Sequence, residues 1–283
     1  MKTTCYKNAA DFLAAAGKYL ASNEARYALI NGIAKAVAIN PHRYGTADPW
    51  FCSVGTGKDI NAAAIRTPPY MVLLAYFSGN IEAIAEELVH AVAKDFEAVP
   101  GVVADKELGD IFAGLWCQKY GARITHTQAQ RIYKLVKVNN VPLAPGRLRV
   151  ATMADKELVI KWAHAFHIDV GGEVRHAAEG DPTPGLEQGW VFFWEDGGRP
   201  VAMAVKTRPT EKGITVGGVY TPPELRGKGY ATSCVAELSQ QILQSGLEFC
   251  TLYTDLANPT SNSIYMKIGF KPVCDSVEYT IEK

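Results

Sequence analysis

The feature that most constrains the fold of this chain is a glycine-containing turn between a predicted strand and a long predicted helix. The strand is expected from Ile214 to Thr221, where apolar residues follow a turn-forming stretch. The turn reads TPPELRGKGYA over Thr221–Ala231, and the helix keeps one apolar face until it stops at Gly246. The unpaired N–H groups of the first helical turn and the positive end of the helix dipole make this junction suited to an anion.

The residues of this turn fit a phosphate group. Gly227 and Gly229 allow close approach of the backbone and unusual dihedral angles. Arg226 and Lys228 can add charge-assisted hydrogen bonds. The turn has neither the G-x-G-x-x-G pattern of dinucleotide sites nor the G-K-[ST] ending of nucleoside triphosphate loops, which disfavours both classes. The simpler alternative is a plain strand-to-helix turn with two solvated basic side chains.

A second informative stretch lies downstream. A strand is predicted over Phe249–Thr254, and NPTSNSIYMKIGF follows it over Asn258–Phe270. Pro259 suits the first turn of a helix and Gly269 suits its C-terminal cap. We therefore expect a short helix that carries an asparagine at its start and a tyrosine near its end.

The two stretches together resemble the signatures of the GNAT superfamily of N-acetyltransferases. In that family a strand, a [QR]-x-x-G-x-[GA] loop and the next helix hold the pyrophosphate of coenzyme A. Arg226, Gly229 and Ala231 fill the three defined positions of the loop. The second signature is an asparagine, here Asn258, seven residues before a Tyr265 that opens Y-x-K-x-G-F. The resemblance implies an α/β fold in which a mixed, mostly antiparallel twisted sheet is flanked by helices.

The resemblance also implies a reaction, the transfer of an acetyl group from acetyl-CoA to a primary amine of a small molecule or peptide. The neutral amine attacks the thioester directly, backbone groups hold the thioester oxygen and the pantetheine arm, and the side chain of Asn258 reaches that arm. Tyr265 is the implied catalytic residue, a phenol that donates a proton to the leaving thiolate. The implied cofactor-binding residues are Val219, Thr221, Arg226, Gly227, Lys228, Gly229, Tyr230, Ala231 and Asn258.

Each of these roles has a structural alternative. Tyr265 is also explained as a core aromatic, and Asn258 as a simple helix cap. The general base is open among Glu173, His176, Glu179 and Glu187, which also suit solvated surface positions. Two further histidines, His164 and His167, stand three apart on a predicted helix, but no third ligand is in view and no metal site is expected.

The turn-rich segment Asn139–Gly146 reads as a linker between two halves of similar length, 1–138 and 147–283. The first half is predicted to begin with two helices between Asn8 and Ile39, broken near Asn23. Strands and helices then alternate up to Tyr120 in the order seen in the second half. Each half is expected to end on a strand that closes its own sheet, Arg131–Val138 and Val273–Ile281 respectively.

The first half therefore looks like a degenerate tandem copy of the same domain. The turn after its predicted strand reads FSGNIE over Phe77–Glu82, without R-G-x-G, and Glu82, Glu86 and Glu87 would place negative charge near a phosphate. No Y-x-K-x-G-F follows either. We expect this half to lack a cofactor of its own and to shape the acceptor cleft or support the second domain. The alternative is an unrelated α/β domain that matches in length only.

Composition bounds the class of protein. The formal net charge is zero and 48% of the residues are apolar, which argues weakly against a dedicated nucleic-acid partner. No apolar run approaches the roughly 20 residues that span a bilayer. Six scattered cysteines without a CxxC pair suggest reduced thiols in a cytoplasmic protein. We expect a monomer or homodimer without nucleic-acid or membrane partners.

Two other functions remain open at this stage. One is a non-catalytic module that senses acetyl-CoA and transfers nothing. The other is an acyltransferase that uses a different acyl-CoA. The presence of Tyr265 favours an enzyme, because a sensor has no need of a proton donor to sulfur.

Overall fold

The computed structural model describes residues 1–170 and 181–283, which form two compact units. The N-terminal unit comprises Met1–Ile132 together with Val273–Lys283. The C-terminal unit comprises Tyr133–Pro272. No helix within the described ranges has the length and apolar content needed to cross a membrane.

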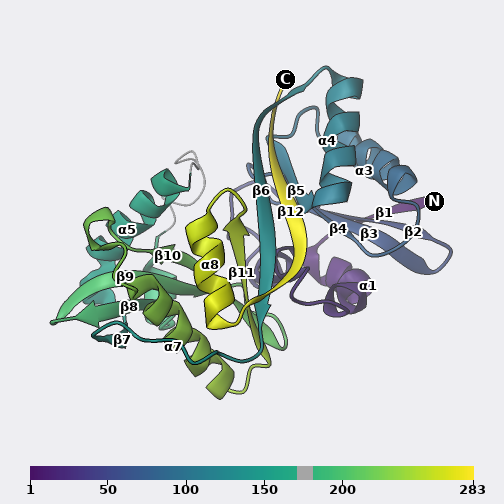
Figure 1. The fold of residues 1–283 in the computed structure, drawn as a ribbon. Coiled ribbons are helices and arrows are strands. Elements are labelled where there is room, and N and C mark those ends of the chain that lie inside the picture. Colours follow the sequence, from purple (N-terminus) through teal and green to yellow (C-terminus); the bar gives the residue numbers. More distant parts are fainter. Residues whose placement is uncertain (171–180) are drawn as a thin grey trace. The chain divides into compact units, whose positions relative to one another are not determined.

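The first half of the chain alternates strands and helices (Figure 1). The two helices predicted before Ile39 are confirmed, and the side chain of Asn8 begins the first of them by accepting a hydrogen bond from the Asp11 N–H. The elements are β1 (Lys2–Tyr6), α1 (Ala9–Ala21), α2 (Ala28–Ile39), β2 (Trp50–Thr56), β3 (Asp59–Arg66), β4 (Val72–Tyr76), α3 (Ile81–Asp95), β5 (Gly101–Asp105), α4 (Lys106–Tyr120) and β6 (Arg123–Leu135).

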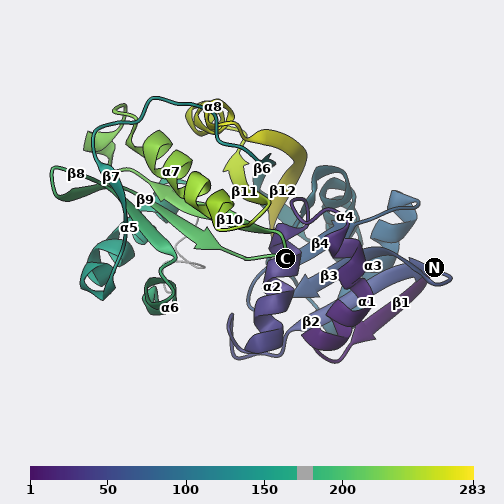
Figure 2. The same ribbon diagram turned by 90° about the horizontal axis from the view of Figure 1, so that it is seen from below.

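Helices cover both faces of the sheet in the N-terminal unit, α1 and α2 on one side and α3 and α4 on the other (Figure 2). The alternation of side chains along β2 and β3 explains this layering. Phe51 and Ala63 pack with Phe12 of α1, whereas the next residues along each strand, Cys52 and Ala64, pack with α3 and α4. Each face of the sheet therefore has its own apolar core.

The second half repeats this order of elements, with two short 3₁₀ turns added. The elements are β7 (Arg147–Val150), η1 (Met153–Asp155), α5 (Lys156–Asp169), α6 (Thr183–Glu187), β8 (Val191–Asp196), β9 (Arg199–Thr207), β10 (Gly213–Tyr220), η2 (Pro223–Leu225), α7 (Tyr230–Gln244), β11 (Phe249–Asp255), α8 (Pro259–Ile268) and β12 (Lys271–Glu282). In each half, three antiparallel pairings are followed by one parallel pairing, β4 with β5 and β10 with β11.

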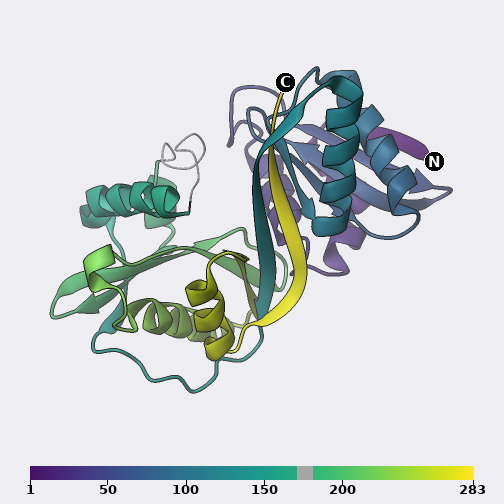
Figure 3. The ribbon, with the colours of Figure 1, turned by 45° about the horizontal axis from the view of Figure 1, so that its top comes forward.

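The last strand of each half does not close its own sheet, and that expectation was wrong. The final strand β12 pairs antiparallel with β5, from Ser276 opposite Asp105 to Thr280 opposite Gly101. In turn, β6 lies beside β12, and its other neighbour is β11 of the second half (Figure 3). Two hydrogen bonds of 2.6 and 3.0 Å from the Arg131 guanidinium to the Asp275 carboxylate join β6 to β12. The two halves have exchanged their final strands.

Three elements differ from the sequence expectation because they are polar or short. The strand β6 begins at Arg123 rather than Arg131, and its first residues, ITHTQAQ after Arg123, are polar and mostly exposed. The edge strand β1 and the five-residue helix α6 were not predicted at all. A weak apolar pattern gives no periodicity signal in such segments.

The predicted linker Asn139–Gly146 has no regular structure and lies within the C-terminal unit. Its Ala144 N–H donates a 2.7 Å hydrogen bond to Ser233 Oγ of α7, so the segment is fixed to that helix. The compact units place Val273–Lys283 with the first half of the chain. The domain limits 1–138 and 147–283 remain a prediction.

Candidate functional site

The strands β10 and β11 pair over only part of their length. Within these two fully described strands, the parallel pairing runs from Gly213 opposite Phe249 to Thr215 opposite Thr251. The strands continue to Tyr220 and Asp255, respectively. A bulge between Gly217 and Tyr220 also shifts the register of β10 against β9. The backbone of β10 near Val219 therefore has no partner from β11 and is available to a ligand lying between the strands.

The bulge depends on a glycine. Gly218 has φ of +56°, in the left-handed region that other residues rarely take. A side chain there would also meet Val205 Cγ2 at 3.1 Å. The sequence Gly217-Gly218 thus allows the strand to bend away from β11 at the level where the candidate site begins.

The turn that follows β10 presents an uncapped helix start. Gly227 and Gly229 have φ of +78° and +81°, and Gly229 is the N-cap of α7 without any side-chain capping bond. Asparagine side chains cap α1, α3 and α8 by accepting a backbone N–H, whereas α2, α4, α5 and α6 have no side-chain cap either. The residues from Arg226 to Gly229 are exposed. The first amides of α7 are therefore left for an anion from solution.

The side chains of Arg226 and Tyr230 already have partners within the C-terminal unit. Arg226 Nε donates a 2.9 Å hydrogen bond to the Thr221 carbonyl, and the same guanidinium forms an ion pair with Asp169 at the end of α5. The Tyr230 hydroxyl donates a 2.6 Å hydrogen bond to the Asp196 carboxylate. A candidate anion site at this turn would thus consist of backbone amides, with exposed Lys228 as a nearby cation.

A buried hydroxyl next to the turn lacks a partner. Among the described residues, Thr221 Oγ1 is shielded from solvent and makes no hydrogen bond. A buried hydroxyl without a partner is costly in a folded protein. Its position at the end of β10, one residue beyond the strand, would suit a ligand that brings its own polar group.

Tyr265 lies on α8 and is 8% exposed. It belongs to the apolar cluster that contains Tyr230, and Val219 and Leu225 pack against the same cluster. Its ring meets Phe270 edge-on with centroids 6.0 Å apart. Burial raises the pKa of the Tyr265 phenol to about 12. The phenol is therefore neutral at physiological pH and carries a proton that it can donate.

Asn258 is exposed and caps α8, since its side chain accepts a 3.0 Å hydrogen bond from the Ser261 N–H. A second asparagine, which sequence reasoning did not single out, holds the helix in place. Asn262 Nδ2 donates to the carbonyls of Asp255 and Asn258 at 2.8 and 2.7 Å. Its Oδ1 accepts from the Tyr133 hydroxyl at 3.0 Å. Asn262 could have been noticed in the sequence because it lies one helical turn after Asn258 within the same signature.

The acceptor side of the C-terminal unit is only partly described. Three candidate bases, Glu173, His176 and Glu179, lie outside the described residues. Glu187 is exposed at the end of α6.

A buried pair of hydroxyls, Thr215 Oγ1 and Thr251 Oγ1 at 3.0 Å, joins β10 to β11 where their pairing ends.

The two predicted helix histidines, His164 and His167, both lie on α5. Burial, together with the neighbouring charge of His164, lowers the pKa of His167. Across residues 1–170 and 181–283, no cluster of three or more His, Cys, Asp or Glu side chains is placed to hold a metal ion.

The matching junction of the N-terminal unit is built differently. There β4 is followed by Phe77 and Ser78, whose N–H groups both donate to the Asn61 carbonyl. Asn80 then caps α3 by accepting a 2.8 Å hydrogen bond from the Ala83 N–H, and Glu82 lies in the first turn. An internal cap and a carboxylate occupy the position where α7 leaves free amides.

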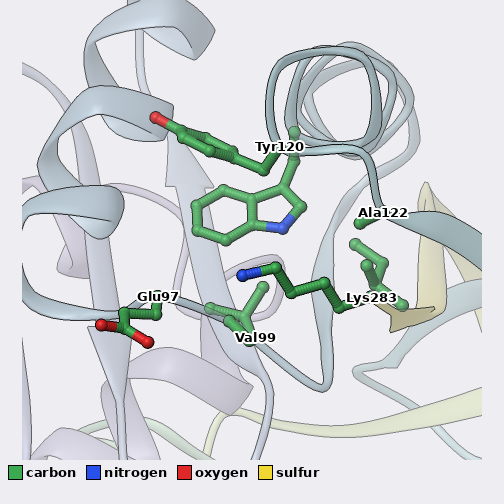
Figure 4. A pocket seen from close by; sticks show the side chains of 8 residues that line it. Glu97, Val99, Tyr120, Ala122 and Lys283 are labelled. Atoms are coloured by element: carbon green, nitrogen blue, oxygen red, sulfur yellow. The ribbon is translucent and has the colours of Figure 1, made fainter.

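The N-terminal unit also has a small surface pocket, which shares no residue with the candidate site (Figure 4). Its floor is apolar, and Glu97 and Lys283 bring charge to it. The lining residues are Glu97, Ala98, Val99, Trp116, Tyr120, Ala122, Ile281 and Lys283.

Comparisons with known proteins agree with this geometry. Residues 157–270 match the model of the acetyltransferase (GNAT) family. A Drosophila protein has a TM-score of 0.68 at 14% identity, with 98% of each chain covered. A GCN5-related N-acetyltransferase from Sphaerobacter thermophilus has a TM-score of 0.63 at 14% identity, covering 99% of this chain and 95% of its own. A search of curated proteins found no match.

A third structure bears on the repeat. A tandem GNAT protein from the clavulanic acid biosynthesis pathway has a TM-score of 0.58 at 12% identity, with 99% of this chain and 98% of that chain covered. At such identities the likeness concerns the fold. The predicted fold class is confirmed, a mixed and mostly antiparallel sheet flanked by helices like that of the acetyltransferase structures.

Proposed function

Because residues 157–270 match the model of the GNAT acetyltransferase family, we propose that this chain is an N-acetyltransferase. It transfers the acetyl group of acetyl-CoA to a primary amine of a small molecule or peptide. Acyl transfer from an acyl-CoA follows from the family. The acetyl donor, the amine acceptor and the residues named below belong to the proposal.

The observation that carries the proposal is the junction of β10 and α7. Gly229 begins α7 without a side-chain cap, so the amides from Arg226 to Ala231 can bind the pyrophosphate of coenzyme A. The free backbone near Val219 and the unpartnered hydroxyl of Thr221 then line the path of the pantetheine arm. Asn258 lies at the start of α8 and is assigned to the same arm, in addition to its capping bond.

The chemistry is a direct displacement. The nitrogen lone pair of the neutral amine forms a bond to the thioester carbonyl carbon, the carbon–sulfur bond breaks, and the amine proton leaves to a base. The β10 backbone donates to the carbonyl oxygen as negative charge develops on it. Tyr265 gives its proton to the departing sulfur as negative charge develops on it, and burial in an apolar cluster keeps the phenol protonated until that step. Glu187 remains a candidate base, with Glu173, His176 and Glu179.

We assign the first half of the chain, 1–138, as a degenerate copy without a cofactor site. The internal cap of Asn80 and the carboxylate of Glu82 support this assignment. The catalytic domain is assigned to 147–283. A cytoplasmic location and a monomer or homodimer without nucleic-acid or membrane partners complete the proposal, supported by six free thiols and a net charge of zero.

Ligand-induced stabilisation tests the binding site. Acetyl-CoA at 100 times its Kd should stabilise the chain by about 2.7 kcal/mol, seen as a rise in Tm. Gly229→Glu should abolish this rise, because a carboxylate would enter the anion site. Gly246→Glu is the matched control, since it has the same left-handed backbone (φ +98°), open space around it and the same added charge at the far end of α7.

An equal rise in Tm for both glutamate variants would show that the turn does not bind the cofactor. If acetyl-CoA binds and no amine releases free CoA thiol, the chain is a sensor and not an enzyme. The amine panel should include amino acids, polyamines, aminoglycosides and peptide N-termini. A parallel panel of longer and acidic acyl-CoA donors distinguishes an acetyltransferase from another acyltransferase.

A further inference from the structure

Two cysteines face each other across the first pair of strands in the N-terminal unit. Cys5 on β1 is opposite Cys52 on β2 in the antiparallel register that runs from Lys2 opposite Gly55 to Tyr6 opposite Phe51. Directly opposed residues point to the same face of a sheet, with Cβ atoms about 4.5 to 5.5 Å apart. We propose that Cys5 and Cys52 are a redox-modification site, oxidised by hydroperoxides to an intramolecular disulfide.

The strand geometry allows the bond to close. A disulfide needs Cβ atoms about 3.5 to 4.5 Å apart, so the two strands must approach by about 1 Å at this level. The strand β1 is at the edge of the sheet, with β2 as its neighbour, and is therefore free to move on its other side. A central strand held on both sides would resist the same shift.

The two thiols differ in a way that assigns their roles. Cys5 is exposed, whereas Cys52 is fully buried in the core formed with α3 and α4. Burial, together with the adjacent Cys5 thiol, raises the pKa of the Cys52 thiol. The peroxide therefore meets Cys5 first, and Cys52 is the resolving thiol directly opposite it on β2.

The reaction balances in two steps. The Cys5 thiolate attacks one peroxide oxygen, the oxygen–oxygen bond breaks, and hydroxide leaves, which gives a sulfenic acid. The Cys52 sulfur then attacks the Cys5 sulfur, its proton joins the departing hydroxyl, and water leaves as the disulfide forms. Two thiols are oxidised and one peroxide is reduced. The product ties the edge strand β1 to β2.

The remaining cysteines lack this arrangement. Cys250 is opposite Ile214 in the parallel pairing of β10 and β11, and Cys234 is buried on α7. Cys117 lies on α4 and Cys274 on β12, both partly buried. These four side chains serve as internal controls for the selectivity of oxidation.

The test is to treat the full chain with hydrogen peroxide, remove the oxidant, unfold the protein and count thiols. The count should fall by two from six, and peptide mapping without reductant should find Cys5 joined to Cys52. Amide hydrogen exchange in β1 should slow at least tenfold, because the edge strand can no longer fray. Dithiothreitol should restore both the six thiols and the faster exchange.

Variants separate the steps. Cys52→Ala should accumulate a Cys5 sulfenic acid that dimedone traps, and Cys5→Ser should leave Cys52 reduced. Cys117→Ser is the matched control and should form the Cys5–Cys52 bond as the parent chain does. Oxidation of Cys5 in the parent chain to a dimedone adduct or to disulfide-linked dimers, without the internal bond, would overturn the proposal.

Discussion

We expect the hydroxyl of Tyr265 to serve as the acid. The ring is already buried among apolar neighbours, and its packing does not require a hydroxyl. Tyr265→Phe should lower kcat about 100-fold or more, the usual contribution of a positioned acid. The Kd of acetyl-CoA, from the titration of Tm, should stay within a factor of two or three. Since the pKa of Tyr265 is about 12, loss of this proton should not limit turnover below pH 11.

Tyr133→Phe is the matched control for this experiment. Tyr133 is also a buried tyrosine of the C-terminal unit, and its hydroxyl donates to Asn262. Its loss should cost about 1 kcal/mol of unfolding free energy and change kcat little. If Tyr265→Phe turns over as fast as the parent chain, the acid role is wrong.

The partner of the Arg226 side chain could not be predicted from the sequence. The sequence indicated a phosphate contact, and the structure places its guanidinium on Asp169, 57 residues away. No local pattern announces a partner at that separation. Gly227 and Gly229, by contrast, have the left-handed backbone that the turn required, which is a local property and could be predicted.

At the scale of elements, the 3₁₀ turn η1 that leads into α5 depends on one carboxylate. Asp155 closes a capping box with Thr152 and also accepts from Arg149 of β7 at 2.8 Å, and Arg149 bonds to Glu195 of β8 as well. The hydrogen bond from Arg149 lowers the pKa of Asp155 to about 2. One side chain therefore joins the end of β7 to the 3₁₀ turn that leads into α5.

Asp155→Asn should lower the unfolding free energy at pH 7. The full pKa shift corresponds to about 2 kcal/mol, and solvent screening at the surface reduces the expected loss to about 1 kcal/mol. Because the folded pKa is depressed, this stability is present above pH 4 and is lost as the pH falls from about 4 to about 2. Urea titrations across this range should show a weaker pH dependence for the variant.

Asp181→Asn is the control for this effect. The pKa of Asp181 is also lowered to about 2, first by a hydrogen bond from Thr183 and then by Lys156, but its side chain is 62% exposed. Its replacement should change stability less. Equal effects of the two variants would contradict the role given to the Arg149–Asp155–Glu195 group.

Element prediction succeeded where apolar periodicity was strong. The helix predicted after the glycine turn is α7 (Tyr230–Gln244), and the strand predicted over Phe249–Thr254 is β11 (Phe249–Asp255). The first part of β6 failed because its polar residues carry no such stripe. The strand forms through hydrogen bonding to its neighbours, which is a property of the sheet and not of the segment.

At the scale of the whole molecule, the strand exchange governs what can fold alone. A fragment of residues 147–283 lacks β6, the neighbour of β11, and also β5, the partner of β12. We expect it to melt without cooperativity, to aggregate, and to show no rise in Tm with acetyl-CoA. Circular dichroism melts and size-exclusion chromatography will check this against the full chain.

A fragment of residues 121–283 provides the control, because it restores β6 beside β11. It should be more soluble than 147–283 and recover part of the acetyl-CoA response. A cooperative melt of 147–283 with the same response as the full chain would show that the second half closes its own sheet.

The repeat of the elements was visible in the sequence and the exchange was not. Each half carries its own succession of periodic segments, so the tandem fold could be predicted. The choice of partner for β6 and β12 could not, because neither strand has a regular alternation of buried and exposed residues that would specify one neighbour.

The exchange also has a consequence for synthesis on the ribosome. The Ser276 hydroxyl donates a 2.8 Å hydrogen bond to the Ala104 carbonyl across 172 residues of sequence. The free edge of β5 must therefore wait until the segment Lys271–Glu282 has emerged from the exit tunnel. Domains usually fold one after another as the nascent chain grows. Here the first half completes its sheet only after translation of the second, and its exposed edge is the natural point for a chaperone to protect meanwhile.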